Sequence, residues 1–323
     1  MDKIAILTGD PNGIGAEITL KALNILNLPA DKIVLISNNE ILKYYNDIPS
    51  CRQCYAELNN YEVIEIPYKK SDIKPGEVTA QAGEFSFQSL KKVCELKPKA
   101  IITAPVAKNS LNQAGYKFNG QTEVLQKYLS HDNQLAEMLF VANNFRVLLL
   151  TRHCALKEIN ITKEMVIKKI ENLVQTFKTI FKIKEPKFAL CGFNPHAGED
   201  GILGKEEIEI LIPAVNYLLS EGIDITYPKP SDTLFINAGK NYYNNQKDTY
   251  DCYIACYHDQ GLIPIKTIAG DKTVNTTIGL DIIRTSPGHG TAFDIAGKNT
   301  ANPESMIEAI KLAIKLSKNF LFF

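Results

Sequence analysis

The sequence predicts an α/β protein with largely parallel strands. Short apolar runs alternate with longer segments of helical spacing along the chain, without internal repeats or low-complexity tracts. Such alternation is typical of parallel strands that are covered by helices on both faces. The 323 residues correspond to about two domains.

The elements can be predicted in chain order from apolar spacing and from residues that begin or end helices. Thr162 caps one predicted helix, in which residues 166, 170, 173, 174 and 177 form an apolar stripe. Asn302, Pro303 and Glu304 open the last helix as capping residue, first helical residue and first-turn acid. The predicted strands are 3–8, 33–36, 100–103, 145–150, 187–191 and 251–256, and the other predicted helices are 14–26, 81–96 and 206–220.

The charge balance argues against a general nucleic-acid-binding protein. Lys and Arg together number 36, as do Asp and Glu, so the formal net charge is zero. Binding to a nucleic-acid backbone requires a basic face. A small cluster of cations around an anionic substrate is still compatible with this balance.

The chain has the features of a soluble, cytoplasmic protein without a membrane segment. Its first apolar run is too short for a secretory signal, and no run approaches the ~18 apolar residues that span a bilayer. Seven cysteines, an odd number, favour reduced thiols over a disulfide framework. Cys51 and Cys54 have zinc-ribbon spacing, but Cys252 and Cys256 do not, so we expect free cysteines.

Three of the five histidines follow predicted strands. His153 follows the strand 145–150, His196 the strand 187–191, and His258 the strand 251–256. In open parallel sheets, ligands bind outside the carboxyl ends of the strands. Each histidine alone is explained as a satisfied polar residue, but three neutral imidazoles together are typical of a catalytic divalent-metal site, with zinc the natural occupant. We expect His131 to lie in a surface loop.

A second candidate group is cationic and polar, and consists of Lys266, Asn275 and Arg284. Arg284 follows two isoleucines, and this apolar setting favours an arginine that binds a partner. A phosphate or carboxylate can accept bidentate hydrogen bonds from a guanidinium group. An internal salt bridge is the alternative for each cation.

The glycine-rich sequence Gly-Asp-Pro-Asn-Gly-Ile-Gly at 9–15 lies between a predicted strand and a predicted helix. Its backbone amides either face an anion or only form a tight turn. It matches neither a Rossmann fingerprint nor a phosphate-binding P-loop. The sequence therefore does not support a Rossmann nucleotide site.

Six motifs in order make the chain resemble the 4-hydroxythreonine-4-phosphate dehydrogenase family of pyridoxal 5'-phosphate biosynthesis. The resemblance extends nearly end to end. The motifs are Gly-Asp-Pro-Asn-Gly-Ile-Gly at 9–15, Thr-Ala-Pro-Val-Ala-Lys at 103–108, Asn-Pro-His-Ala-Gly-Glu at 194–199, Asp-Thr-Leu-Phe at 232–235, Tyr-His-Asp-Gln-Gly at 257–261 and Arg-Thr-Ser at 284–286.

The resemblance implies the two-domain isocitrate/isopropylmalate dehydrogenase-like fold, with mostly parallel sheets, flanking helices and an active site in the interdomain cleft. We expect an outer domain from 1–120 plus 268–323, which carries the cofactor loop. The middle domain, 121–267, is expected to be inserted into it and to carry the metal ligands and the dimer contacts.

The resemblance also implies roles for individual residues. His153, His196 and His258 would bind the metal (Zn, Mg or Co) at a site shared across a homodimer. The implied substrate-binding residues are Gln121, Thr122, Lys266, Asn275 and Arg284. The family usually has histidine where this chain has Gln121, and a glutamine can donate to a phosphate oxygen but cannot carry a charge.

A more distant likeness concerns the segment 289–303, which is similar to the cofactor loop of isopropylmalate and isocitrate dehydrogenases. By this likeness His289, Asp294 and Asn302 would lie near the adenosine end of NAD or NADP. Asn302 has a rival role as a helix cap.

The implied reaction is metal-dependent oxidation of 4-phosphooxy-L-threonine at its 3-hydroxyl, followed by decarboxylation to 3-amino-1-hydroxyacetone 1-phosphate. Lys266 and Asp232 are the candidate catalytic residues, and Asp259 is an alternative base or a partner that orients a histidine. Three other functions remain open at this point. They are a same-fold dehydrogenase of another four-carbon phosphate, such as a phosphorylated threonate or erythronate, a metal-dependent hydrolase, and a non-catalytic phosphometabolite binder.

Overall fold

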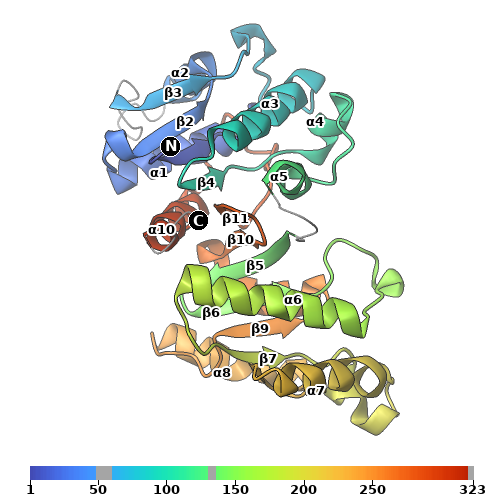
Figure 1. Ribbon diagram of the computed structural model, residues 1–323. Coiled ribbons are helices and arrows are strands. Elements are labelled where there is room, and N and C mark those ends of the chain that lie inside the picture. The colour runs from blue at the N-terminus through green and yellow to red at the C-terminus, as the bar shows by residue number, and fades with distance from the viewer. Residues whose placement is uncertain (49–59, 130–135, 319–323) are drawn as a thin grey trace. The chain divides into compact units, whose positions relative to one another are not determined.

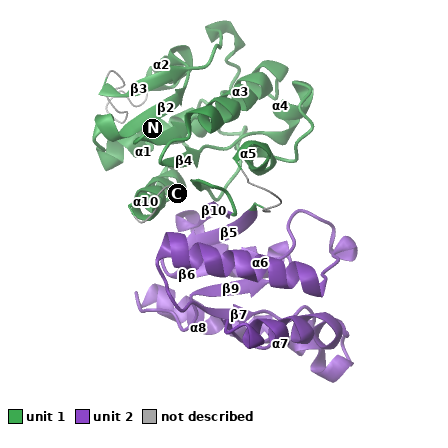
Figure 2. Ribbon diagram, viewed as in Figure 1, with its two compact units in different colours: residues 1–136, 279–318 green, residues 137–278, 319–323 purple. Residues whose placement is uncertain are grey.

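A computed structural model describes residues 1–48, 60–129 and 136–318, which divide into two compact units (Figures 1 and 2). Unit 1 contains residues 1–136 and 279–318, and unit 2 contains residues 137–278. The second unit is therefore inserted between two segments of the first. Cys51, Cys54 and His131 lie outside the described residues.

Unit 1 is built on a parallel sheet with the order β3-β2-β1-β4-β11. The three central strands are short runs of apolar residues that are buried along their whole length, as parallel strands covered on both faces require. The strands are β1 (Ile4–Leu7), β2 (Ile33–Ser37), β3 (Glu62–Glu65), β4 (Ala100–Thr103) and β11 (Ile283–Pro287).

The helices of unit 1 form two groups, and within each group the helices contact one another. Helices α1 (Gly15–Leu26), α2 (Asn39–Asn46) and α10 (Glu304–Ser317) form one group. Helices α3 (Ala80–Leu96), α4 (Lys108–Gln113) and α5 (Gln121–Leu129) form the other (Figure 1). Both groups contact strands of the sheet, so the unit has the layered α/β architecture expected from the sequence.

Unit 2 has a mixed sheet with the order β10-β5-β6-β9-β7-β8. Strand β5 is antiparallel to both of its neighbours, whereas β6, β9, β7 and β8 are parallel. The strands are β5 (Glu137–Ala142), β6 (Phe145–Leu149), β7 (Lys187–Leu190), β8 (Asp224–Ile225), β9 (Cys252–Ala255) and β10 (Val274–Ile278).

The helices of unit 2 also fall into two groups. Helix α6 (Lys163–Thr176) contacts α7 (Ile212–Ser220), and α8 (Ser231–Tyr243) contacts α9 (His258–Ala269). The second group shares an apolar core with β6 and β9, in which Phe145, Phe235 and Tyr253 pack edge to face or tilted. This packing fixes where α9, and thus His258 at its first position, lies on the sheet.

The unit boundaries fall later in the chain than the expected 121–267. Helix α5 packs against α3 and therefore stays with unit 1. Strand β10 pairs with β5 over the full length 274–278 and therefore stays with unit 2. The sequence has no linker signal at either boundary, because the chain passes from one unit to the other directly beside β5 and β10.

Two helix starts differ from the sequence prediction. The segment expected as one helix over 206–220 begins with a π-helical turn, Glu207–Leu211, and continues as α7. Pro213 lies in the first turn of α7 and has no N–H to donate, which disfavours a regular α-helix across this point. Pro303 precedes the first residue of α10, and Asn302 Oδ1 accepts a hydrogen bond from Glu304 N at 3.0 Å.

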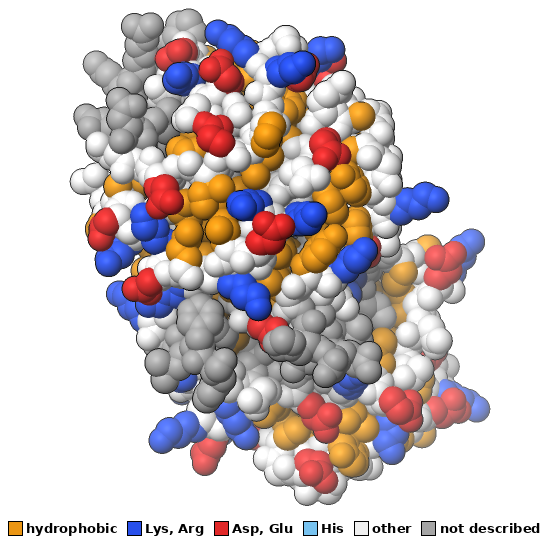
Figure 3. All heavy atoms as spheres, turned by 45° about the horizontal axis from the view of Figure 1, so that its top comes forward, with side chains coloured by type: hydrophobic (Ala, Val, Ile, Leu, Met, Phe, Trp, Pro, Cys, Tyr) orange, Lys and Arg blue, Asp and Glu red, His pale blue; other side chains and the backbone are white. Residues whose placement is uncertain are grey.

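The surface charges agree with the balanced composition of the chain. Lys, Arg, Asp and Glu side chains intermingle over the face shown in Figure 3, with no broad region of one sign. Among the described helices, none has the length and apolar character needed to cross a bilayer. The described cysteines are free thiols, and burial raises the pKa of Cys94 and Cys191 to about 12, so neither is a reactive thiolate at neutral pH.

Candidate functional site

The three histidines singled out by the sequence follow three adjacent strands of unit 2. Strand β9 lies between β6 and β7 and is parallel to both. The residues after β6 are tied to those after β9, because Leu150 N donates to Ala255 O and Thr151 Oγ1 donates to Cys256 O, both at 2.8 Å. This tie brings the loop of His153 to the start of α9.

His153 and His258 lie together at this edge. Their ring centroids are 5.4 Å apart, and the ring planes are inclined at 55°. His258 Nδ1 lies 2.7 Å from the Asp259 carboxylate, in hydrogen-bond range. A carboxylate at Nδ1 fixes the ring orientation and presents Nε2 to a ligand. Asp259 therefore has the orienting position that the sequence offered as one of its two possible roles.

His196 lies on an unusual turn after β7. Residues 196 to 200 all have positive φ, with His196 at 54° and Glu199 at 44°. Such left-handed conformations are costly for residues other than glycine and require support from their surroundings. His196 is exposed, and its Nδ1 lies 3.9 Å from Glu199 Oε2.

Glu207 supports this turn from inside unit 2. Its side chain is buried, and its two carboxylate oxygens accept hydrogen bonds from Asn194 N at 2.7 Å and Asn194 Nδ2 at 2.9 Å. The turn also packs closely on Glu207, since a Cβ at Gly198 would lie 2.7 Å from its Oε2. The carboxylate thus fixes the residues that immediately precede His196.

Two of the three predicted metal ligands, His153 and His258, lie together at the carboxyl ends of β6 and β9. Two neutral imidazoles, one of them oriented by a carboxylate, are typical ligands of zinc and related ions. Within the described part of the chain, no group of three or more His, Cys, Asp or Glu side chains has the arrangement of a metal site. The structure therefore brings His153 and His258 together but does not bring His196 to them.

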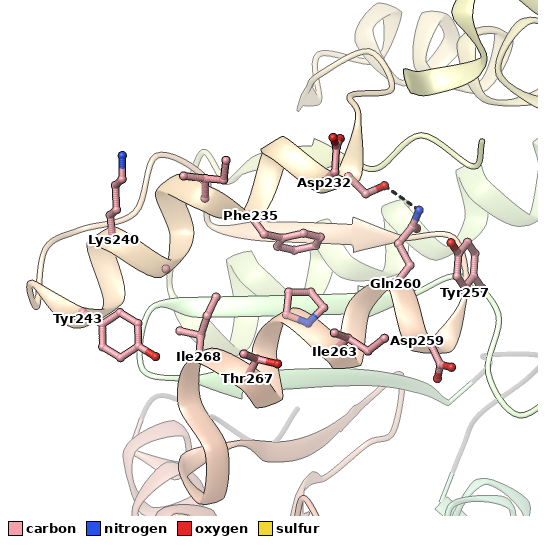
Figure 4. A pocket seen from close by; sticks show the side chains of 14 residues that line it. Asp232, Phe235, Lys240, Tyr243, Tyr257, Asp259, Gln260, Ile263, Thr267 and Ile268 are labelled. Carbon is pink, nitrogen blue, oxygen red and sulfur yellow. Dashed lines mark hydrogen bonds between the residues drawn. The ribbon is translucent and has the colours of Figure 1, made fainter. Parts of the chain in front are cut away.

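A cavity of about 830 Å³ lies between α8 and α9 (Figure 4), and Tyr257 and Asp259, the sequence neighbours of His258, are among its lining residues. Its walls are mainly apolar, with Phe235, Ile263 and Ile268 among them, and Asp232 and Asp259 lie toward one end. At that end Gln260 Nε2 donates to Ser231 Oγ at 2.8 Å. Both carboxylates are exposed.

Lys266 and Asn275, two of the predicted substrate-binding residues, also belong to unit 2. Lys266 is exposed in the last turn of α9, the helix that begins with His258. Asn275 lies on β10, and its Oδ1 is a buried atom without a hydrogen-bond partner among the described residues. A buried amide oxygen without a partner is unfavourable, and a ligand that donates a hydrogen bond would relieve this.

Arg284 in unit 1 is almost fully buried on β11, at 1% exposure. Its Nε and one terminal nitrogen donate to Thr103 Oγ1 at 3.0 and 2.7 Å, and the other terminal nitrogen lies 3.5 Å from Thr122 Oγ1. Burial lowers the pKa of Arg284 to about 9, because the charged guanidinium is removed from water.

The start of α5 adds further polar groups beside Arg284. Helix α5 begins at Gln121, so the positive end of its dipole lies at Gln121 and Thr122. Gln121 Oε1 is buried without a hydrogen-bond partner in the described structure. A buried guanidinium, a hydroxyl and a helix N-terminus together have the chemistry of a site for a phosphate or carboxylate.

The glycine-rich loop at 9–15 forms a tight turn that binds other parts of unit 1. The backbone amides of Asp10, Asn12, Gly13 and Ile14 donate to Pro105 O, Asp10 Oδ1, Asp10 O and Thr291 O respectively. These amides are thus already used inside the protein, which supports the turn over an anion site.

The predicted cofactor segment follows β11. His289 Nδ1 contacts Gly290 O at 2.9 Å, and His289 Nε2 is buried without a described hydrogen-bond partner. Asp294 is exposed. Asn302 accepts from Glu304 N, so the rival capping role of Asn302 is present in the structure.

Sequence reasoning missed Thr103 and Glu207 as functional positions. Thr103 ends β4 and is the first residue of a motif used for the family resemblance, so its position was the available signal. Glu207 lies in a segment predicted only as a helix, and its contact with Asn194 joins residues 13 apart in sequence. No local pattern points to that contact.

Comparison with known proteins agrees with the resemblance. The chain matches the family described as "Pyridoxal phosphate biosynthetic protein PdxA" over residues 6–313. It is 39% identical over 330 residues to the 4-hydroxythreonine-4-phosphate dehydrogenase of Sulfurihydrogenibium sp., covering 98% of this chain and 99% of the relative. The structure of the 4-hydroxythreonine-4-phosphate dehydrogenase from Klebsiella pneumoniae superposes with a TM-score of 0.83 at 32% identity, covering 98% of each chain.

A more distant structure extends the comparison of the fold alone. A beta-decarboxylating dehydrogenase from Thermococcus kodakarensis superposes with a TM-score of 0.53 at 15% identity, covering 98% of this chain and 84% of the other. The isocitrate/isopropylmalate dehydrogenase-like α/β fold expected from the sequence is confirmed by these neighbours.

Proposed function

Because the chain belongs to the family of the pyridoxal phosphate biosynthetic protein PdxA, we propose that it is a 4-hydroxythreonine-4-phosphate dehydrogenase acting in pyridoxal 5'-phosphate biosynthesis in the cytoplasm. It oxidises 4-phosphooxy-L-threonine at the 3-hydroxyl with NAD or NADP. The observation that carries this proposal is the family match over residues 6–313, together with relatives of that name that cover nearly the whole chain.

The buried group around Arg284 supports the phosphorylated substrate. The guanidinium group of Arg284, the Thr122 hydroxyl and the start of α5 favour an anion such as the substrate phosphate. Gln121, Lys266 and Asn275 bind the remaining polar groups of the substrate in this proposal. The buried oxygens of Gln121 and Asn275 support it, because each would gain a hydrogen-bond donor from the substrate.

His153, His196 and His258 hold a divalent metal (Zn, Mg or Co) in this proposal, at a site shared between two subunits. When bound, such an ion lowers the pKa of a coordinated hydroxyl and polarises a neighbouring carbonyl. Asp259 orients His258 through Nδ1. Because one described chain brings together only His153 and His258, a second subunit is the proposed source of the arrangement that His196 completes.

In this proposal Asp232 is the general base of the reaction, and Lys266 stabilises the negative charge that develops. Asp232 would accept the proton of the 3-hydroxyl, and a bound nicotinamide would supply the hydride acceptor for C3. The product of oxidation is a β-keto acid, which loses carbon dioxide readily because its ketone accepts the electron pair. Lys266 offsets the negative charge that develops there, and the final product is 3-amino-1-hydroxyacetone 1-phosphate.

The cofactor is NAD or NADP, with His289, Asp294 and Asn302 near its adenosine end. His289 Nε2 supports this role, because a buried ring nitrogen without a described partner can accept a hydrogen bond from a ligand. Binding of the dinucleotide outside a Rossmann domain is compatible with the absence of a Rossmann fingerprint from the sequence.

The apolar cavity between α8 and α9 supports a homodimer. Ile236, Tyr243 and Ile263 line it with exposed fractions of 52%, 70% and 64%, and Asp259 lies at its edge. Exposed apolar surface of this kind is typical of subunit contacts. An Ile236→Asp variant should shift the protein from dimer to monomer in light scattering, whereas Ile25→Asp, at an exposed isoleucine on α1, should leave the dimer intact.

The test of the proposed function is an assay with 4-phosphooxy-L-threonine, NAD or NADP and added divalent metal. Reduced cofactor and released carbon dioxide should appear in equal amounts. Threonate 4-phosphate and erythronate 4-phosphate belong in the same panel, because oxidation of one of these in place of 4-phosphooxy-L-threonine would favour the alternative same-fold dehydrogenase. Release of inorganic phosphate without cofactor reduction would contradict a dehydrogenase.

A further inference from the structure

Glu17 and Lys21 connect helix α1 to the end of the predicted cofactor segment. Glu17 is fully buried, and its Oε1 accepts a hydrogen bond from Ala301 N at 2.9 Å. Lys21 donates to Glu17 Oε1 at 2.8 Å, Asn299 O at 3.1 Å and Ala301 O at 2.9 Å. All three ammonium donors of Lys21 are thus used, and two of them bind backbone about 280 residues away in sequence.

The same helix also holds the beginning of the segment. Ile14 N, directly before α1, donates to Thr291 O at 3.0 Å. Gly13 lies so close that a Cβ there would be 3.0 Å from Thr291 Cβ and O. Both ends of the segment 291–301 are therefore attached to α1 and the loop before it.

Asn12 attaches the middle of the segment indirectly. Its side chain accepts from Lys74 N and donates to Glu77 O, at 2.8 and 3.0 Å, and so fixes the turn around Pro75. That turn packs on the cofactor segment, since a Cβ at Gly297 would lie 2.9 Å from Pro75 Cβ. The glycine-rich loop and α1 together form a frame for the segment.

The frame contacts a segment with left-handed backbone. Ala292 and Asn299 have φ of 43° and 58°, a region that is costly for alanine and that asparagine tolerates better. Lys21 binds the carbonyl of Asn299 itself. Such conformations persist where surrounding contacts impose them.

We infer that Glu17 and Lys21 are positioning residues for the nicotinamide cofactor, acting through the backbone of 299–301. The inference rests on the proposed function, because it takes this segment as the cofactor loop. Without the two side chains the segment samples other conformations, and the dinucleotide must order it on binding. Its affinity for the protein therefore falls, while we expect substrate binding by Arg284 in unit 1 and by Lys266 and Asn275 in unit 2 to be unaffected.

The test compares Lys21→Met with Lys311→Met. Lys311 forms a solvent-exposed ion pair with Glu308 on α10, so it is a matched loss of one lysine charge without the buried contacts. NADH binding is measured by fluorescence titration, backbone hydrogen exchange over 296–303 by mass spectrometry, and KM for the phosphorylated substrate by steady-state kinetics.

We expect Lys21→Met to raise the dissociation constant of NADH about tenfold, as loss of charge-assisted hydrogen bonds predicts. Exchange at Ala301 should become faster, and substrate KM should change by less than about twofold. Lys21→Arg, which can still donate to several carbonyls, should restore most of the affinity. Lys311→Met should match the parent protein in all three measurements.

Unchanged NADH affinity in Lys21→Met would overturn the inference, whether or not exchange over 296–303 becomes faster. If that variant does not fold, Glu17→Gln tests the other positioning residue, because glutamine still accepts from Ala301 N but loses the charge that holds Lys21. Its NADH affinity should also fall, and an unchanged affinity would overturn the inference. Failure of the proposed function is seen separately, as absence of cofactor binding and reduction in the parent protein.

Discussion

The proposed anion site around Arg284 in unit 1 and the histidine group of unit 2 are built in opposite ways. Arg284 lies on a strand, is 1% exposed and is held by two hydrogen bonds to Thr103. His153 and His196 lie in loops and are exposed, and only His258 begins a helix. One group is complete inside its unit, whereas the other has two of its three members together.

The difference indicates where each group obtains its geometry. The guanidinium group is oriented before any ligand binds, at the free-energy cost of burying a charge. The imidazoles are close to solvent and have little burial cost, and in the proposed site a bound ion and a second subunit complete their arrangement. The unit 1 group should therefore respond to substitution through substrate affinity and stability, and the unit 2 group through metal affinity and turnover.

The largest effect is expected from His258→Ala. Substitution of residues that only orient a metal ligand typically costs about 10–100-fold in affinity or activity, so loss of a ligand should lower kcat by more than about 100-fold. The KM for cofactor should stay within about twofold. Metal content after dialysis and steady-state kinetics measure both effects, and Cys154→Ser, at an exposed residue of the His153 loop, is the control. Normal metal content and kcat would remove His258 from the metal site.

Substitution of Arg284 should change substrate affinity and leave metal binding unchanged. Arg284→Lys should raise substrate KM about tenfold to 100-fold, because one ammonium replaces a fork of donors. Metal content should not change. Equal substrate KM in the variant and the parent would exclude Arg284 from the anion site.

Arg284→Met should also reveal the cost of burial. The pKa of Arg284 is lowered to about 9, so at pH 7 the folded chain carries this charge less favourably than the unfolded chain does. Removal of the charge should therefore raise the free energy of unfolding by about 1 kcal/mol in the absence of substrate. Replacement of buried ionic groups by apolar residues often stabilises a protein in this way. Thermal unfolding without ligand measures it, and a fall in Tm would show that the Thr103 contacts outweigh the burial cost.

A smaller effect is expected from Glu207→Gln, which tests the support of the His196 turn. Both carboxylate oxygens of Glu207 accept from Asn194, and an amide would direct its NH₂ group at one of these donors. Metal affinity should fall about tenfold, with a stability loss of about 1–2 kcal/mol.

Glu206→Gln is the matched control for this substitution. Glu206 accepts from Asn194 Nδ2 with one oxygen only, and a glutamine oxygen can keep that bond. Metal titration with a competing chelator should separate the two variants. Equal metal affinities would show that the left-handed turn does not depend on Glu207.

The contrast between the two groups also explains what the sequence could predict. Strands β1, β2, β4, β6, β7 and β9 are short apolar runs, and their carboxyl ends indicated where His153 and His258 would lie. Helix α9 was missed because it contains Gly261 and Pro264. Gly261 is required by packing, since a Cβ there would lie 2.6 Å from Leu149 Cδ2, and such a tertiary reason is not visible in local sequence.

Contacts between distant residues were equally hidden. Arg284 and Thr103 are 181 residues apart, and their hydrogen bonds depend on the pairing of β11 with β4. The apolar setting of Arg284 indicated an arginine that binds a partner, but not which residues surround it. The left-handed turn at His196 was also unpredicted, because Ala197 and Glu199 adopt positive φ that their residue types disfavour.

The smallest effect is expected from Gln121→His, which restores the residue usual in the family. Gln121 lies at the start of α5 with one buried oxygen lacking a described partner, and either side chain can donate to a phosphate oxygen. Substrate KM at pH 8 should therefore change by less than about threefold. A histidine can also become charged as the pH falls toward its ordinary pKa near 6.5, so the variant should bind substrate more tightly than the parent at pH 6. A kcat that rises strongly at both pH values would instead show that this position takes part in proton transfer, and that glutamine limits the reaction in this chain.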